Sequence, residues 1–163
     1  MGTRSLTKVI ETWKDESGKK QRKPITCMYR QFDGYLDGHG AELAEWLSQY
    51  TIVNGIKMDH DRNKVFNGMD CLAAQMFVHF KANGCKEDGT PVSIPGNIYC
   101  MHPDAENCWE EYLYEISEGN EGILLTVYET FSGGSAATFS DVKEIFHGTP
   151  EELLTKIEEY VED

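Results

Sequence analysis

Two apolar runs near the N-terminus have the spacing of β-strands. Apolar and polar residues alternate over Ser5–Glu11, and the β-branched and aromatic run Pro24–Phe32 has the composition of a second strand. A polar stretch with Gly18 near its centre separates the two runs, and such a stretch is typical of a turn. We therefore expect an N-terminal hairpin whose connecting residues are rich in lysine.

Three further segments place apolar residues at helical spacing. Over Ala41–Tyr50 and over Met69–Ala82 the apolar residues recur every three or four positions, which predicts two helices with one buried face each. The C-terminal segment begins with Thr149 as an N-cap, Pro150 in the first turn and Glu152 three residues after the cap. This capping-box pattern predicts a third helix that runs to the C-terminus.

The remaining apolar runs predict four further strands. A short polar turn joins two of them, Trp109–Ser117 and Gly122–Phe131, which predicts a second hairpin. The other two expected strands are shorter, Ile98–His102 and Asp141–Phe146. Strands and helices occur in separate runs instead of alternating, which favours the α+β class. We expect a single domain over residues 1–163, with an antiparallel sheet covered on one face by about three helices.

Charge is distributed unevenly along the chain. The 163 residues carry a formal net charge of −13, but residues 1–30 have a net charge of +5 and residues 103–163 a net charge of −14. An acidic C-terminal third repels nucleic acid and has two interpretations: an ordinary solvated surface, or a surface that imitates DNA toward a basic protein. This distribution predicts no direct contact with nucleic acid.

The segment MYRQFDGYLDGHGAELAEWL contains the main candidate site. Glycines let a ligand approach the backbone, the start of a helix favours an anion, and an arginine suits a phosphate or carboxylate. Arg4 joins Arg30 if the first two strands pair, and Tyr29, Phe32 and Tyr35 offer rings for stacking. The predicted ligand-binding residues are Arg4, Arg30, Gln31, Asp33, Tyr35, Gly38, His39 and Gly40.

The same segment has other interpretations. Asp-Gly and Gly-His-Gly are also turn sequences, with Arg30 paired to Asp33 or Asp37. A metal-dependent hydrolase would recruit Asp33, Asp37 and His39 together with the Asp59-His60-Asp61 cluster, although none of these has a diagnostic metal-site spacing. We therefore expect no catalytic residues, no metal and no cofactor.

Cysteine usage and hydropathy bear on the cellular setting. The chain has five cysteines, and the absence of a signal-peptide-like or membrane-spanning apolar run predicts a cytoplasmic protein with free thiols. A structural zinc site formed by Cys85, Cys100, His102 and Cys108 stays open, because only one close pair of ligands is present.

Residues 1–80 resemble a family of proteins from phages and bacteria. The segments that carry the resemblance are GTRSLT (Gly2–Thr7), MYRQFDGY (Met28–Tyr35), GHGAELAEWL (Gly38–Leu47), TIVNGI (Thr51–Ile56) and NGMDCLAAQ (Asn67–Gln75). The resemblance covers about half of the chain. It implies a phage or bacterial setting, hence the cytoplasm of a bacterial host cell, and it implies no activity.

These observations together favour a non-enzymatic protein that captures a phosphorylated or nucleotide-like small molecule. In a phage, such capture would serve as a counter-defence. Two alternatives remain at this stage. One is an acidic inhibitor that binds a basic host protein by imitating DNA, and the other is the metal-dependent hydrolase. The ligand, the host target and the oligomeric state do not follow from the sequence.

Overall fold

The computed structural model describes residues 2–82, 87–89, 98–130 and 142–162. Eight strands and three α-helices are described, and a π-helical turn at Leu36–Gly40 precedes the first helix. The strands are β1 (Ser5–Lys14), β2 (Lys20–Arg30), β3 (Thr51–Val53), β4 (Val65–Asn67), β5 (Ile98–Met101), β6 (Tyr112–Gly119), β7 (Gly122–Thr130) and β8 (Val142–Gly148). The helices are α1 (Ala41–Leu47), α2 (Gly68–Ala82) and α3 (Pro150–Glu162).

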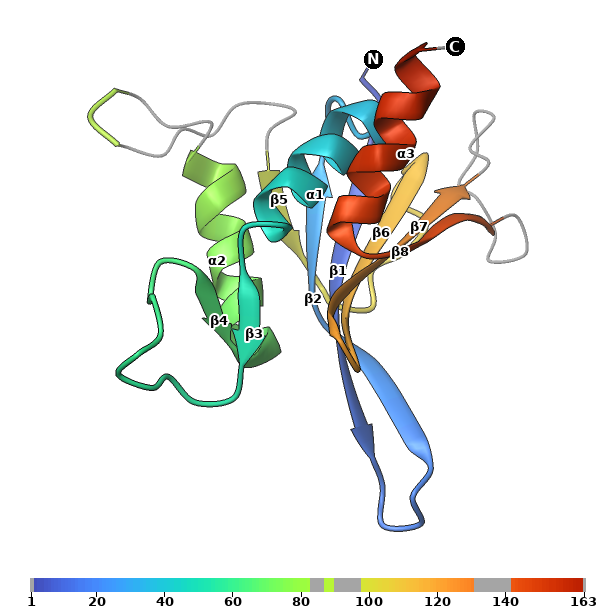
Figure 1. Ribbon diagram of the computed structural model, residues 1–163. Coiled ribbons are helices and arrows are strands. Elements are labelled where there is room, and N and C mark those ends of the chain that lie inside the picture. The colour runs from blue at the N-terminus through green and yellow to red at the C-terminus, as the bar shows by residue number, and fades with distance from the viewer. Residues whose placement is uncertain (1, 83–86, 90–97, 131–141, 163) are drawn as a thin grey trace.

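Six of the described strands form one sheet in the order β5-β2-β1-β6-β7-β8, and β3 pairs with β4 in a small separate sheet (Figure 1). The predicted α+β class is confirmed. The large sheet is mixed and not wholly antiparallel, because β1 and β6 run parallel, with Ser5 opposite Tyr112 and Val9 opposite Ile116. The cause is the segment 102–111, which carries the chain from the edge strand β5 back across the sheet before β6 begins.

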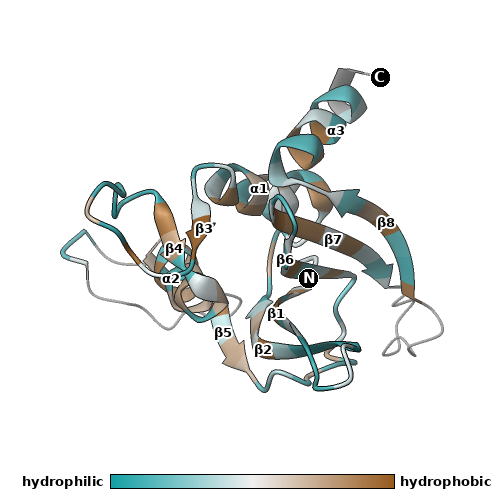
Figure 2. Ribbon diagram, turned by 60° about the horizontal axis from the view of Figure 1, so that its bottom comes forward, coloured by the Kyte–Doolittle hydropathy of each residue, from teal (hydrophilic) through white to brown (hydrophobic). Residues whose placement is uncertain are grey.

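The helices pack on one face of the large sheet. Apolar residues lie along α1 and along the neighbouring strands β6 and β7 (Figure 2). Leu43 and Leu47 of α1, Met76 of α2 and Leu153 of α3 are at most 1% exposed, and they share one core with Tyr114 of β6. This burial is what the helical spacing of the apolar residues predicted.

The predicted hairpins and helices occur close to their expected positions. β1 and β2 pair antiparallel, as do β6 and β7, and both pairs are longer than expected at the turn end. The cap of α3 is also confirmed, since the Thr149 hydroxyl accepts a hydrogen bond from the backbone N–H of Glu152 at 3.2 Å. Tyr160 follows the buried residues Leu153 and Ile157 of α3 at helical spacing, but it is 82% exposed.

The second face of the large sheet, here called the outer face, lies away from the helices. It carries Leu6, Lys8 and Ile10 of β1, which alternate with the helix-facing residues Thr7 and Val9. Tyr29 of β2 and Tyr99 of β5 are opposite each other on this face, with ring centroids 6.0 Å apart. The segment 102–111 passes beside it, because Ala105, Glu106 and Asn107 line the same pocket as Lys8 and Ile10.

Candidate functional site

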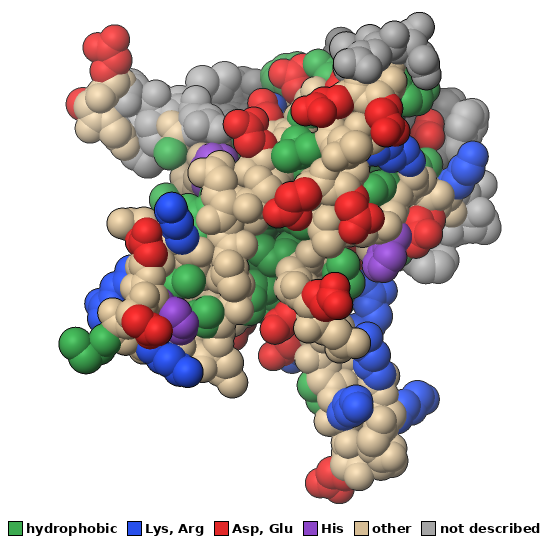
Figure 3. All heavy atoms as spheres, viewed as in Figure 1, with side chains coloured by type: hydrophobic (Ala, Val, Ile, Leu, Met, Phe, Trp, Pro, Cys, Tyr) green, Lys and Arg blue, Asp and Glu red, His purple; other side chains and the backbone are tan. Residues whose placement is uncertain are grey.

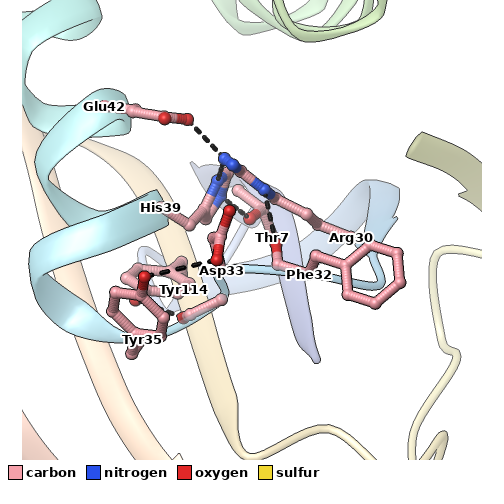
Figure 4. Close-up of polar contacts among 9 residues, drawn as sticks. Thr7, Arg30, Phe32, Asp33, Tyr35, His39, Glu42 and Tyr114 are labelled. Atoms are coloured by element: carbon pink, nitrogen blue, oxygen red, sulfur yellow. Dashed lines mark hydrogen bonds and ion pairs between the residues drawn. The ribbon is translucent and has the colours of Figure 1, made fainter. Parts of the chain in front are cut away.

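The predicted site residues Arg30 and His39 meet in a buried polar network beneath α1 (Figure 4). His39 is fully buried, and its Nε2 lies 2.7 Å from Oγ1 of Thr7 on β1. Its Nδ1 lies 3.1 Å from Nη1 of Arg30, which also forms an ion pair with Glu42 of α1. Nε of Arg30 donates to the Phe32 carbonyl at 2.8 Å. The network thus ties β1, β2 and α1 to one another.

The partners of His39 determine its protonation. A guanidinium has donors only, so the Nδ1 that faces Arg30 must accept, and the proton of the neutral ring sits on Nε2. Nε2 therefore donates to the Thr7 hydroxyl. Burial, together with the charge of Arg30, lowers the pKa of His39 to about 3, so the ring is neutral at physiological pH.

This arrangement is the reverse of a nucleophile–base pair. A histidine that activates a hydroxyl must accept its proton, but the nitrogen of His39 that faces Thr7 is already protonated. Thr7 and His39 are also both fully buried, so neither contacts solvent. The pair therefore stabilises the fold and is not arranged to perform acyl transfer.

The turn before α1 uses its own backbone donors. The N–H of His39 donates to the Asp33 carbonyl at 2.7 Å, and the N–H groups of Gly38 and Gly40 both point to the Tyr35 carbonyl, at 3.0 and 3.4 Å. α1 itself has only seven residues. The hypothesis of an anion site at this helix start needed backbone N–H groups without partners. The N–H groups of Gly38, His39 and Gly40 instead bond to carbonyls of the turn.

Gly34 has a packing role that explains its presence in this segment. A Cβ at Gly34 would lie 2.8 Å from Cβ of Ser5 and 2.9 Å from the carbonyl carbon of Arg4. The backbone of Gly34 is held against β1 because its N–H donates to the Thr3 carbonyl, while its own carbonyl accepts from the buried Tyr114 hydroxyl at 2.8 Å. The glycine permits close packing of two backbone segments.

Replacing Gly34 with alanine is expected to destabilise the protein by about 3 kcal/mol, because the backbone of β1 must move to admit the methyl group. Gly55→Ala is the matched control. It lies in open space with φ +94°, so its cost of about 1 kcal/mol is conformational only. Urea unfolding measures both variants, and equal losses would contradict the packing explanation.

The structure separates the predicted site residues into four places. Arg30 and His39 belong to the buried network, and Asp33, Gly38 and Gly40 form the turn. Tyr35 lies in a hollow of about 300 Å³ between the turn and α3, together with Tyr112 and Tyr160. Arg4 and Gln31 lie elsewhere, on the outer face beside Tyr29.

The fourth place is a broader hollow at the β2–β5 end of the outer face. It has a volume of about 660 Å³ and is here called the aromatic hollow. The residues that line it are Tyr29, Gln31, Phe32, Tyr99, Cys100, Met101 and Cys108. Two of the three rings that the sequence suggested for stacking, those of Tyr29 and Phe32, are present here.

Arg4 is held at this hollow by Tyr29. Burial raises the pKa of Tyr29, and the charge of Arg4 and a hydrogen bond from its side chain oppose that rise. The Tyr29 hydroxyl donates in turn to Oε1 of Gln31 at 2.5 Å. The first two strands pair as expected. Arg4 does not join Arg30, however, because Arg4 lies beside Tyr29 on the outer face while Arg30 bonds to His39 and Glu42 on the helix side of the sheet.

Sequence reasoning missed Tyr99, and it considered Cys108 only as a ligand of the possible zinc site. Both are about 70 residues or more from Tyr29 in the chain, and only the pairing of β5 with β2 brings Tyr99 opposite it. The alternation within the expected strand Ile98–His102 was a usable signal, since Tyr99 and Met101 share one face of that strand.

Metal-ligating side chains do not gather in the part of the chain that the structure describes. No three His, Cys, Asp or Glu side chains lie together there in a group that would hold a metal ion. Cys85 of the possible zinc site falls outside the described residues, so that full ligand set stays a prediction. His60 lies in the β3–β4 connection, where its Nδ1 accepts from the N–H of Lys57 at 3.0 Å, whereas His39 is buried in the network.

Comparisons with protein-family models, with curated proteins and with solved structures found no match to this chain. Within the described residues, no helix has the length and apolar character needed to cross a membrane.

Proposed function

We propose that the protein binds a small phosphorylated, nucleotide-like ligand in the aromatic hollow and releases it unchanged. The observation that carries this proposal is the convergence of three rings, those of Tyr29, Phe32 and Tyr99, with the guanidinium of Arg4 beside them. These four residues come from the start of β1, from β2 and the turn after it, and from β5.

The chemistry of the hollow matches the two parts of a nucleotide. Stacking of a base on an aromatic side chain contributes about 1–3 kcal/mol, and it requires only a flat ring on the ligand. Arginine is the side chain best suited to phosphate, because its planar donors match two phosphate oxygens. The volume of about 660 Å³ lies within the range of small-molecule sites, roughly 300–1,000 Å³.

Two further considerations favour capture over catalysis. The buried hydroxyl–imidazole pair, Thr7 and His39, has the wrong donor direction for a nucleophile and lies on the opposite face of β1 from the hollow. The resemblance to phage proteins suggests a purpose for ligand capture. A phage protein that sequesters a nucleotide signal of the host counters host defence, and this strategy requires no catalysis.

Thermal shift against a panel of mono-, di- and cyclic nucleotides tests the proposal. A ligand present at about 100 times its dissociation constant stabilises the folded state by roughly 2.7 kcal/mol. We expect Tyr99→Ala to weaken the binding about tenfold or more, and Arg4→Gln to weaken binding of the phosphorylated compound more than that of the free nucleoside. Chromatography of the recovered ligand then separates capture from turnover.

Tyr35→Ala is the matched control for Tyr99→Ala. The two tyrosines are 38% and 39% exposed, but Tyr35 lies at the α3 hollow and not at the aromatic hollow. Tyr35→Ala should bind ligand like the unmodified protein. A panel without any shift, or a shift lost in Tyr35→Ala and kept in Tyr99→Ala, would contradict the proposal.

A second candidate function follows from the acidic side chains over α1 and α3 (Figure 3). Glu151, Glu158 and Glu159 of α3 and Glu45 of α1 are all exposed, and Tyr160 stands among the α3 residues. An acidic surface with an exposed aromatic ring is suited to a basic protein partner. If no nucleotide shifts the melting temperature, this inhibitor function is favoured. A pull-down with the protein as bait then tests whether a basic partner binds this surface.

A further inference from the structure

The hairpin formed by β1 and β2 extends beyond the large sheet. The pairing of β1 with β6 ends at Val9, while its pairing with β2 continues to Lys14 opposite Lys20. Residues 10–24, here called the arm, therefore project as a two-stranded ribbon (Figure 1). Five residues of each strand at about 3.3 Å per residue give the ribbon a length of roughly 17 Å.

The arm is basic although the chain is acidic. Its charged residues are Lys14, Asp15, Glu16, Lys19, Lys20, Glu11, Arg22 and Lys23. The arm accordingly has a net charge of +2, against −13 for the whole chain. Blue side chains gather on the projecting ribbon in Figure 3, well apart from the red ones over α3.

Three of the lysines, Lys14, Lys19 and Lys20, have no ion-pair partner among the described residues. Asp15, which follows Lys14 in the chain, uses its carboxylate to hold the turn: it accepts from the hydroxyl of Ser17 at 2.6 Å and from the Lys19 backbone N–H at 2.9 Å. These hydrogen bonds lower the pKa of Asp15. Asp15 therefore shapes the tip and does not pair with the lysine side chains.

The pairing of Lys14 with Lys20 is unfavourable for the isolated protein. Like charges directly opposite each other in an antiparallel pair destabilise a hairpin. Such a cost is offset when an anion lies between or beside the two ammonium groups. The arrangement thus lowers the stability of the free protein, because either lysine could be replaced by a neutral polar residue with a gain in stability.

We propose that the arm binds the phosphate backbone of double-stranded DNA, with its tip in a groove. A two-stranded ribbon fits the major groove of B-DNA. The lysines at the tip and on the two strands face the groove walls, and Trp13, 42% exposed with Nζ of Lys23 5.6 Å from its ring centre, adds an apolar contact beside them. Lysine contacts to phosphate position a protein without selecting a base sequence.

The acidic part of the chain does not prevent this contact. The Debye length at physiological ionic strength is about 8 Å, and the ribbon is roughly 17 Å long, so solvent ions largely screen the charges of α3 at the tip. Glu118 of β6 and Glu144 of β8 are closer to the arm, since they line a hollow together with Lys20. The expectation of no nucleic-acid contact was based on the charge of chain segments. In the folded protein the basic arm projects away from the acidic helices, so the charge of whole chain segments does not describe the charge that the arm presents to DNA.

Fluorescence anisotropy with a labelled 20-base-pair duplex at several salt concentrations tests this proposal. We expect non-specific binding with a dissociation constant of about 10⁻⁶ to 10⁻⁴ M that weakens steeply with salt. The triple variant K14Q/K19Q/K20Q should bind at least tenfold more weakly at low salt, and its salt slope should be smaller by about 2.7, or about 0.9 for each lost phosphate contact. Its melting temperature should be equal to or higher than that of the unmodified protein, since the Lys14–Lys20 repulsion is removed.

The matched control is K57Q/R62Q/K64Q, which removes three exposed cations from the β3–β4 connection. This control should bind the duplex like the unmodified protein. Equal losses in the two triple variants would overturn the proposal, as would an absence of duplex binding at low salt. Self-association of the protein alone, lost in the arm variant, would place a second copy on the arm and would also overturn it. Tyr99→Ala should leave duplex binding intact, which keeps this test separate from that of the aromatic hollow.

Discussion

Replacing His39 with alanine is expected to destabilise the folded protein by about 4 kcal/mol. Removing a buried ring leaves a cavity, and comparable truncations of aromatic core residues cost roughly 3–5 kcal/mol. The ring packs between Phe80 and Tyr114, with centroids 5.0 Å away in each case. Alanine would also remove the hydrogen-bond partner of the buried Thr7 hydroxyl, which adds to the loss.

Urea unfolding of His39→Ala, compared with His102→Ala, measures this effect. The His102 side chain is 75% exposed, so the control should lie within about 0.5 kcal/mol of the unmodified protein. His39→Gln should fall between the two, because its amide can still donate toward Thr7. A loss below 1 kcal/mol in His39→Ala would show that the network contributes little, and His39 would again be a candidate for ligand binding.

Stability is also expected to fall as the pH is lowered, with His39 as a main cause. The folded state lowers the pKa of His39 to about 3 from its ordinary value of 6.5. Between these two values the unfolded chain binds a proton that the folded chain does not bind, so the free energy of unfolding decreases as the pH falls. For one group the slope is about 1.4 kcal/mol per pH unit within this window.

The comparison that isolates His39 is the unmodified protein against His39→Gln, each unfolded with urea at pH 7, 6, 5 and 4. The difference between their free energies of unfolding should shrink by about 1.4 kcal/mol per pH unit below 6.5. Burial also lowers the pKa of His79, but this residue is present in both proteins and its contribution cancels. Parallel pH profiles would mean that His39 is already protonated in the folded state and would contradict the assigned hydrogen-bond directions.

These two predictions also bear on where ligand binding should be sought. Arg30 was the residue on which the sequence-based site centred, but three of its donor bonds go to His39, Phe32 and Glu42. Arg30→Ala would therefore test stability more than binding. The outer face, with Arg4 beside the aromatic hollow, is the better place for a binding experiment.

Much of the local structure was determined by the sequence itself. The spacing of apolar residues and the turn residues predicted the hairpins β1–β2 and β6–β7 and the buried faces of α1 and α2. The capping residues predicted the start of α3. Each of these signals acts between residues a few positions apart, so a single sequence contains all of the information. The glycines before α1 also marked a real feature, although Gly34 serves to let two backbone segments pack closely.

Only the tertiary structure decided which distant residues meet. The parallel pairing of β1 with β6, the position of Tyr99 opposite Tyr29 and the ion pair of Arg30 with Glu42 each depend on how whole elements pack. Burial likewise decided that His39 is neutral, since the same residue in a solvated turn would titrate near 6.5. Such outcomes depend on desolvation and on contacts between segments far apart in the chain, and no local pattern of residues encodes those two quantities.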